Sequence, residues 1–90
     1  PIVIAPGHRV TLEAFALDAK GREVLDPVTF VWHLDPALRD IDVRLWPHRT
    51  DSGNGKHMDI EAVRREGRGQ ITVSIPGTHA TVRREVTVAR

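Results

Sequence analysis

The sequence predicts an all-β fold, in which about seven short strands form a two-layer antiparallel sandwich. Three observations support this prediction. Apolar and polar residues alternate in short segments along almost the whole chain. Turn-forming residues separate these segments roughly every eight to twelve positions. The only stretch with helical character, Ala37–Arg39, is too short for more than a single turn.

The segment Val28–Asp35 is the predicted centre of the core. It is rich in β-branched and aromatic residues and carries one of the two tryptophans of the chain. Because side chains of a strand point to alternate faces, four apolar residues share one face: Val28, Phe30, Trp32 and Leu34. Burial of each large ring stabilises a fold by roughly 2–3 kcal/mol. We therefore expect this face to fill the space between the two sheets.

Two strands are expected before this central segment. Ile2–Ala5 is a short apolar run that ends at a Pro-Gly turn, which indicates an edge strand. From Arg9 to Leu17 the residues alternate, with an apolar set of Val10, Leu12, Ala14 and Ala16. Asp18–Gly21 then predicts a turn, because the aspartate can accept backbone hydrogen bonds and the glycine can adopt positive φ. Arg22–Leu25 is expected to be briefly extended.

Four strands are expected after the central segment. Asp40–Leu45 alternates, with apolar residues at odd positions, and this phase leaves Trp46 on the polar side. Pro47–Lys56 should be the longest loop, with Asn54-Gly55 as a hairpin-turn pair. The remaining strands are marked by three apolar sets: Met58, Ile60 and Ala62; Ile71, Val73 and Ile75; Val82, Val86 and Val88. Arg84 shares the parity of the last set, so a bulge or an edge position is expected there.

The composition is that of one small domain. A chain of 90 residues buries only about 60–65% of its unfolded surface, which leaves little room for a cofactor cavity. It has no cysteine and therefore no disulfide. Its net charge of +1 comes from mixed charges without a block of five or six like charges, so we expect no nucleic-acid partner. No apolar stretch predicts membrane insertion. Because the chain begins with Pro1, we expect residues 1–90 to be one domain of a larger protein.

Turn and strand signals follow one another in a fixed order along the chain: Pro6-Gly7 with Val10–Ala14, then Asp18–Gly21, Val28–Trp32, Gly67–Val73 and Val86–Val88. Taken in this order, these segments resemble the bacterial immunoglobulin-like (Big) domain, which occurs in tandem in invasin- and intimin-type surface proteins and beside many secreted enzymes. The resemblance covers almost the whole chain and implies an immunoglobulin-like Greek-key sandwich in an extracellular, cell-surface or periplasmic protein. Its motifs are packing and turn signals, which specify a fold and not an activity. The cysteine pair and corner tyrosine of antibody domains are absent.

Side chains that could support catalysis or metal binding are not grouped. No two of the five histidines lie two, three or four residues apart: His8, His33, His48, His57 and His79. Calcium ligands could come from Asp51, Ser52 and Asn54, or from Asp40 and Asp42, but a polar turn and a solvated strand face explain both sets. Nucleophilic catalysis would need a deep pocket where His48, Asp51 and His57 converge. We expect no enzyme, no metal site and no cofactor.

Binding residues are predicted where aromatic side chains lie opposite a core face. Phe15 and Trp46 both have this parity, and an exposed aromatic ring can stack on a sugar or seal a contact with another domain. The alternative is that each ring covers an edge of the sandwich. The resemblance implies a non-catalytic spacer, adhesion or docking module, whose partners are neighbouring domains of the polypeptide or a cell-surface protein or polysaccharide. The second hypothesis is a carbohydrate-binding accessory domain that uses Trp46 and the Pro47–Lys56 loop.

Overall fold

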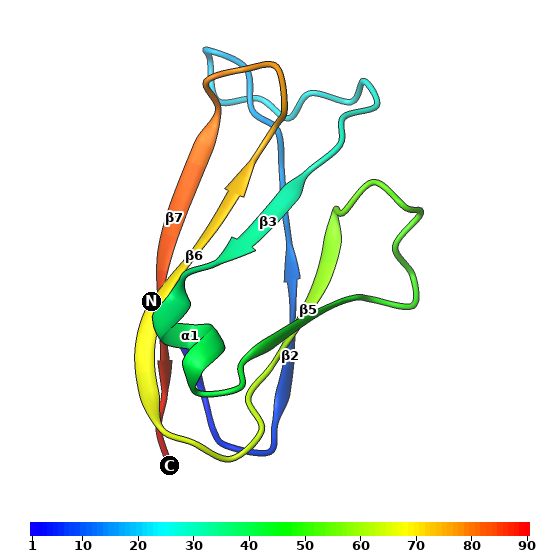
Figure 1. Cartoon of the computed structure of the whole chain (residues 1–90). Coiled ribbons are helices and arrows are strands. Elements are labelled where there is room, and N and C mark those ends of the chain that lie inside the picture. Colours follow the sequence, from blue (N-terminus) through cyan, green and yellow to red (C-terminus); the bar gives the residue numbers. More distant parts are fainter.

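Seven strands and one short helix make up the structure, a computed structural model that describes residues 1–90 (Figure 1). The elements are β1 (Ile2–Ile4), β2 (Arg9–Glu13), β3 (Val31–Leu34), α1 (Pro36–Asp40), β4 (Arg44–Pro47), β5 (His57–Glu61), β6 (Gly67–Ser74) and β7 (Thr81–Val88). They form two packed sheets, so the predicted β-sandwich is confirmed. No helix here has the length and apolar character needed to cross a membrane.

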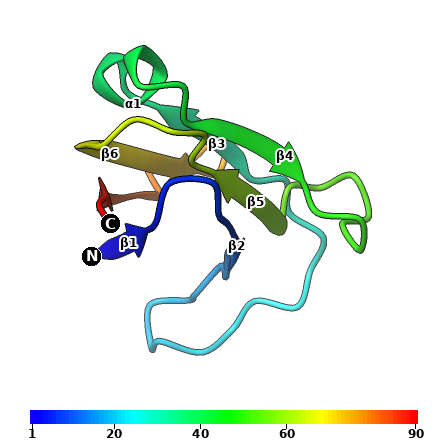
Figure 2. The same cartoon turned by 90° about the horizontal axis from the view of Figure 1, so that it is seen from below.

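The two sheets have the strand order of an immunoglobulin-like sandwich. One contains β1-β7-β6-β3 and the other β2-β5-β4, so the chain changes sheet repeatedly in a Greek-key path. All neighbouring strands are antiparallel except β1 and β7, which pair in parallel from Ile2↔Val86 to Ile4↔Val88. The prediction was of fully antiparallel sheets. The first strand instead lies beside the last strand and runs in the same direction. Both termini lie at this edge (Figure 2).

The core consists of two apolar clusters joined by the predicted tryptophan. The larger cluster contains nine buried residues from both sheets and α1. The smaller one contains Ala14, Ala16 and Phe30. Trp32 is half-buried and packs against both clusters, and its indole N–H donates to the Gly55 carbonyl at 2.6 Å. The predicted inward face of the central segment is therefore confirmed.

The expected strand at Asp40–Leu45 is wrong over its first four residues. Asp35 caps α1 by accepting from the backbone N–H of Leu38 at 3.1 Å, and Pro36 occupies the first turn. This N-cap signal outweighs the alternation that follows it, so the helix extends to Asp40 and β4 begins only at Arg44. The helix contributes Leu38, which is fully buried in the larger cluster.

Two turn expectations also need correction. Asn54-Gly55 does not form a two-residue hairpin, because β4 and β5 are joined by the whole loop of residues 48–56. Arg84 lies on a regular strand, since the β6–β7 register runs unbroken from Gly67↔Val88 to Ser74↔Thr81. The bulge is absent, while the edge position is confirmed, because β1 covers only the last three residues of β7.

Candidate functional site

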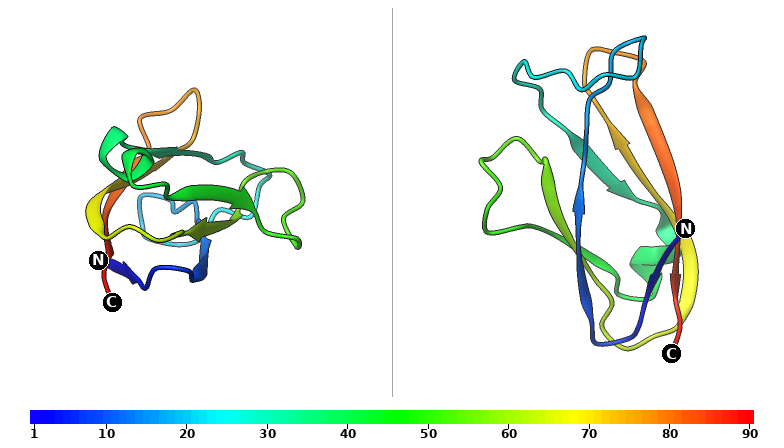
Figure 3. Two further views of the ribbon diagram at one scale, coloured as in Figure 1. Left: turned by 60° about the horizontal axis from the view of Figure 1, so that its bottom comes forward. Right: turned by 180° about the vertical axis from the view of Figure 1, so that it is seen from behind.

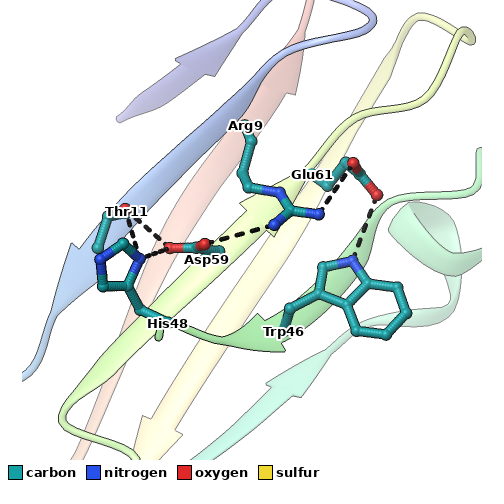
Figure 4. A network of polar contacts seen from close by, with 6 residues as sticks. All are labelled: Arg9, Thr11, Trp46, His48, Asp59 and Glu61. Carbon is teal, nitrogen blue, oxygen red and sulfur yellow. Dashed lines mark hydrogen bonds and ion pairs between the residues drawn. The ribbon is translucent and has the colours of Figure 1, made fainter. Parts of the chain in front are cut away.

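The outward face of the β2-β5-β4 sheet carries the largest group of interacting polar side chains (Figure 4). Because strand residues alternate, β5 directs its odd-numbered side chains outward, and the register places residues of β2 and β4 beside them. We call this surface the polar face. It comprises Arg9, Thr11, Glu13, Arg44, Trp46, His48, His57, Asp59 and Glu61.

Asp59 lies at the centre of the polar face and is its one buried member. Only 6% of the residue is exposed, although its side chain points to the outer side of the sheet. The Thr11 hydroxyl donates to its Oδ1 at 2.7 Å, and His48 Nδ1 lies 2.8 Å from the same oxygen. Arg9 pairs with Oδ2 at 3.6 Å and with Glu61 at 3.2 Å. These contacts join three strands on the solvent side of the sheet.

The contacts of Asp59 keep it ionised. Burial disfavours the charged carboxylate, but the hydrogen bonds from Thr11 and His48 oppose this effect, together with the charges of His48 and Arg9. Their combined effect lowers the pKa of Asp59 below its ordinary value. The polar face therefore contains a fixed negative charge at its centre.

The Thr11–His48–Asp59 group does not have the geometry of a catalytic triad. In a triad, histidine lies between the carboxylate and the hydroxyl and accepts the hydroxyl proton. Here the Thr11 hydroxyl donates to the carboxylate itself, and His48 Nδ1, 3.4 Å from Thr11, faces the same carboxylate oxygen. The two principal cavities of the molecule are lined by other residues. The geometry matches a structural network and gives Thr11 no base.

Trp46 lies on the polar face, as its parity predicted. Its side chain is 42% exposed, and the indole N–H donates to Glu61 at 3.3 Å. An exposed ring with hydrogen-bonding groups at its border can stack on a flat apolar ligand surface while polar neighbours bind its hydroxyls.

Phe15 is also exposed, but it lies away from Trp46. It follows the end of β2, four residues beyond Thr11, which places it about 13 Å along the strand from the row of Trp46. The Lys56 ammonium lies 4.5 Å from the centre of its ring, and the ring lines an apolar cavity between the sheets. The structure therefore does not bring the two predicted binding residues into one site.

The loop of residues 48–56 is held together by Asp51. Its two carboxylate oxygens accept from the backbone N–H groups of Gly53, Gly55 and His57 at 3.0–3.2 Å. The hydrogen bond from the His57 N–H is the main cause that lowers the pKa of Asp51. The carboxylate is thus used within the loop, and no group of three or more His, Cys, Asp or Glu side chains is placed to hold a metal ion. Asp40 and Asp42 do not share a strand face, because Asp40 belongs to α1.

Sequence patterns could not identify the Asp59 network. The outward parity of Asp59 could be read from β5, but its partners come from β2 and β4, and only the strand register brings them together. His48 follows the end of β4, in a segment predicted to be loop. Its backbone N–H nevertheless donates to the His57 carbonyl at 3.0 Å and extends the strand pairing by one residue.

Comparison with known proteins supports the fold. No protein-family model and no curated protein matches the chain. Among solved structures, it is similar to the crystal structure of domains 4 and 5 of the S-layer protein SbsC, with a TM-score of 0.72 and 18% sequence identity. The match covers 99% of this chain and 41% of that chain, so this chain spans about two fifths of that structure. At this identity, the likeness shows a shared β-sandwich fold.

Proposed function

We propose that this chain is a non-catalytic immunoglobulin-like module of a larger bacterial secreted or surface protein. There it acts as a spacer, adhesion or domain-docking element outside the cytoplasm. The resemblance to Big domains supports this proposal, as does the similarity of the fold to domains of an S-layer protein. Its first partners are then the neighbouring domains of the same polypeptide.

The parallel pairing of the first and last strands is the observation that carries the proposal. β1 and β7 lie side by side and run in the same direction along the long dimension of a body of 38 × 25 × 19 Å (Figures 1 and 3). A chain linked at both ends would enter and leave the module in one direction. This geometry suits a spacer that continues the path of its neighbours.

Tension on such a spacer would load the β1–β7 pair in shear. The pull acts on the first end of β1 and the last end of β7, and both forces run along the strands. The hydrogen bonds between them therefore resist the load together. Side chains on the inner side of the pair add apolar burial, since Ile4, Val86 and Val88 are at most 2% exposed.

Single-molecule force spectroscopy with handles at both ends tests this role. The Ala89 N–H donates to the Ile4 carbonyl, so even-numbered residues of β1 direct their backbone toward β7, while the backbone of Val3 points away. Ile2→Pro should therefore lower the unfolding force clearly, because it removes a backbone donor from the shear pair. Val3→Pro is the matched control and should change it little. Equal forces for both variants and the parent chain would contradict the proposal that the β1–β7 pair resists tension.

Exposed Trp46 on the polar face favours a second candidate, a carbohydrate-binding accessory domain. Glu61 and Arg9 lie beside the ring and offer hydrogen bonds to sugar hydroxyls. Titration with chitin oligosaccharides and dextran should then quench tryptophan fluorescence, and Trp46→Ala should abolish the change while Trp32 still fluoresces. Quenching that persists in Trp46→Ala, or no response to any sugar, would exclude this site.

A further inference from the structure

An arginine, a tryptophan and a histidine follow one another on the outer side of β4 and the residue after it. Arg44, Trp46 and His48 share this side because strand residues alternate, and all three belong to the polar face. Neighbours in this line are about 6.5–7 Å apart along the strand, so the line spans about 13 Å. We call it the β4 strip. β4 pairs only with β5, so no strand borders the strip on its other side.

Arg44 is the one charged side chain of the polar face that lacks an ionic partner. All the others are paired: Glu13 with His57, Asp59 with His48 and Arg9, and Glu61 with Arg9. Glu61 lies directly across the strand pair from Arg44, but its two oxygens accept from Arg9 at 3.2 Å and from the Trp46 indole at 3.3 Å. The exposed guanidinium of Arg44 is therefore free to bind an anion.

The Trp46 ring is fixed beside this free guanidinium. Its N–H donates to Glu61, and Arg9 holds the same carboxylate from the other side (Figure 4). The ring lies on the side of the network away from His48 (Figure 4), and the residue is 42% exposed. A ring that is already held in place loses little freedom when a ligand stacks on it.

We propose that the β4 strip binds a carboxylate-bearing sugar, a uronic acid unit of an acidic polysaccharide. This inference rests on the carbohydrate-binding candidate and names the class of its ligand. The apolar side of the sugar ring stacks on Trp46, while its carboxylate accepts two parallel hydrogen bonds from the Arg44 guanidinium. His48 directs Nδ1 to Asp59, which leaves Nε2 for a hydroxyl of the next sugar unit.

The charge and shape of Arg44 favour a carboxylate over other sugar substituents. A neutral hydroxyl would leave the guanidinium without a counter-charge. A phosphate monoester carries close to two negative charges at neutral pH, which one arginine does not balance beside the carboxylates of the polar face. A carboxylate is planar, carries a single charge and matches the two parallel donors of the guanidinium.

NMR titration of the isotope-labelled chain with trigalacturonic acid and with its methyl ester tests the ligand class. The two ligands share the same sugar rings, but the ester has no carboxylate charge. Both should shift the indole N–H signal of Trp46. The acid should bind about tenfold more tightly, because the ester cannot form the charge-assisted hydrogen bonds. The indole of Trp32, which bonds to Gly55 inside the domain, should not shift and serves as the internal reference.

Substitution of Arg44 separates recognition of the carboxylate from a general effect of charge. Arg44→Gln should lower the affinity for the acid about tenfold and leave the affinity for the ester unchanged. Arg83→Gln is the matched control, because Arg83 is an exposed strand arginine without an ion pair on the outer side of the other sheet. Arg44→Lys keeps the charge without the two parallel donors and should have an intermediate affinity.

The outcomes distinguish the ligand class from the carbohydrate-binding candidate itself. Equal affinities for the acid and the ester would overturn the uronate inference and leave the candidate standing. Absence of any shift with these two ligands, chitin oligosaccharides and dextran would refute both. Equal losses in Arg44→Gln and Arg83→Gln would show a general charge effect and also overturn the inference. Tighter binding of galactose 6-phosphate than of galacturonic acid would contradict the choice of a carboxylate.

Discussion

Replacement of Trp32 by phenylalanine should cost about 2–4 kcal/mol of unfolding free energy. The indole N–H that donates to the Gly55 carbonyl at 2.6 Å is lost, and an unsatisfied acceptor costs about 1–3 kcal/mol. The smaller ring also gives up contact with the two clusters that Trp32 joins, which adds about 1 kcal/mol. For a small domain, this is a large share of a total stability of roughly 5–15 kcal/mol.

Urea denaturation followed by far-ultraviolet circular dichroism measures this loss without relying on tryptophan emission. The denaturation midpoint should fall while the slope stays unchanged. Trp46→Phe is the matched control, because that indole is exposed and bonds only to Glu61 at the surface, so its effect should stay within about 0.5 kcal/mol. If the two variants lose the same stability, Trp32 does not join the two halves of the core.

Three further predictions follow from the loop, the helix and the carboxylates. Gly55→Ala should lower the unfolding free energy by about 2–5 kcal/mol in urea denaturation, because the backbone has a φ of 78° and a Cβ would lie 2.4 Å from the Phe30 carbonyl oxygen. Gly53→Ala is the matched control. Its Cβ would meet no atom within 4 Å, so only the positive φ is unfavourable and the loss should be about 1–2 kcal/mol. Leu38→Ala should lower the unfolding free energy by about 2–5 kcal/mol, because Leu38 is fully buried. A smaller loss in thermal denaturation would show that α1 is not part of the core. The pKa of Asp51 is lowered, so its stabilising charge is fully present above about pH 4 and is lost as pH falls through its folded-state pKa. Asp51→Asn should therefore lower stability at pH 7 and reduce the loss on acidification, as thermal melts from pH 7 to 2 will reveal.

The fold could be predicted from the sequence where local signals agreed with the tertiary structure. Alternation correctly assigned the inward faces of the strands that contain Leu12, Trp32 and Ile60, because one side of each packs on the core. It failed after Asp35, since an N-cap and a following proline favoured a helix over the alternating segment. Sequence patterns could not predict the parallel pairing of β1 either, because a run of three residues does not specify the strand with which it pairs.

The candidate site was less predictable than the fold. The position of Trp46 on the outer face followed from its parity, whereas Phe15 lies beyond the end of β2 and its exposed ring lines the cavity between the sheets. The Asp59 network requires the register of three strands, which brings Thr11, His48 and Asp59 together. Each of these is a relation between segments far apart in sequence, for which a single chain carries no local signal.

Amide hydrogen exchange along β7 tests most directly how the first and last strands meet. If β1 covers only Val86–Val88, slow and fast amides should alternate from Thr81 to Glu85, with Val82 and Arg84 protected by β6. From Val86 onward, protection should continue through Thr87 and Ala89, whose N–H groups face β1. Rapid exchange at Thr87 and Ala89 would contradict the parallel strand pair, and uniform protection from Thr81 to Glu85 would contradict the pairing of β1 with only the last three residues of β7.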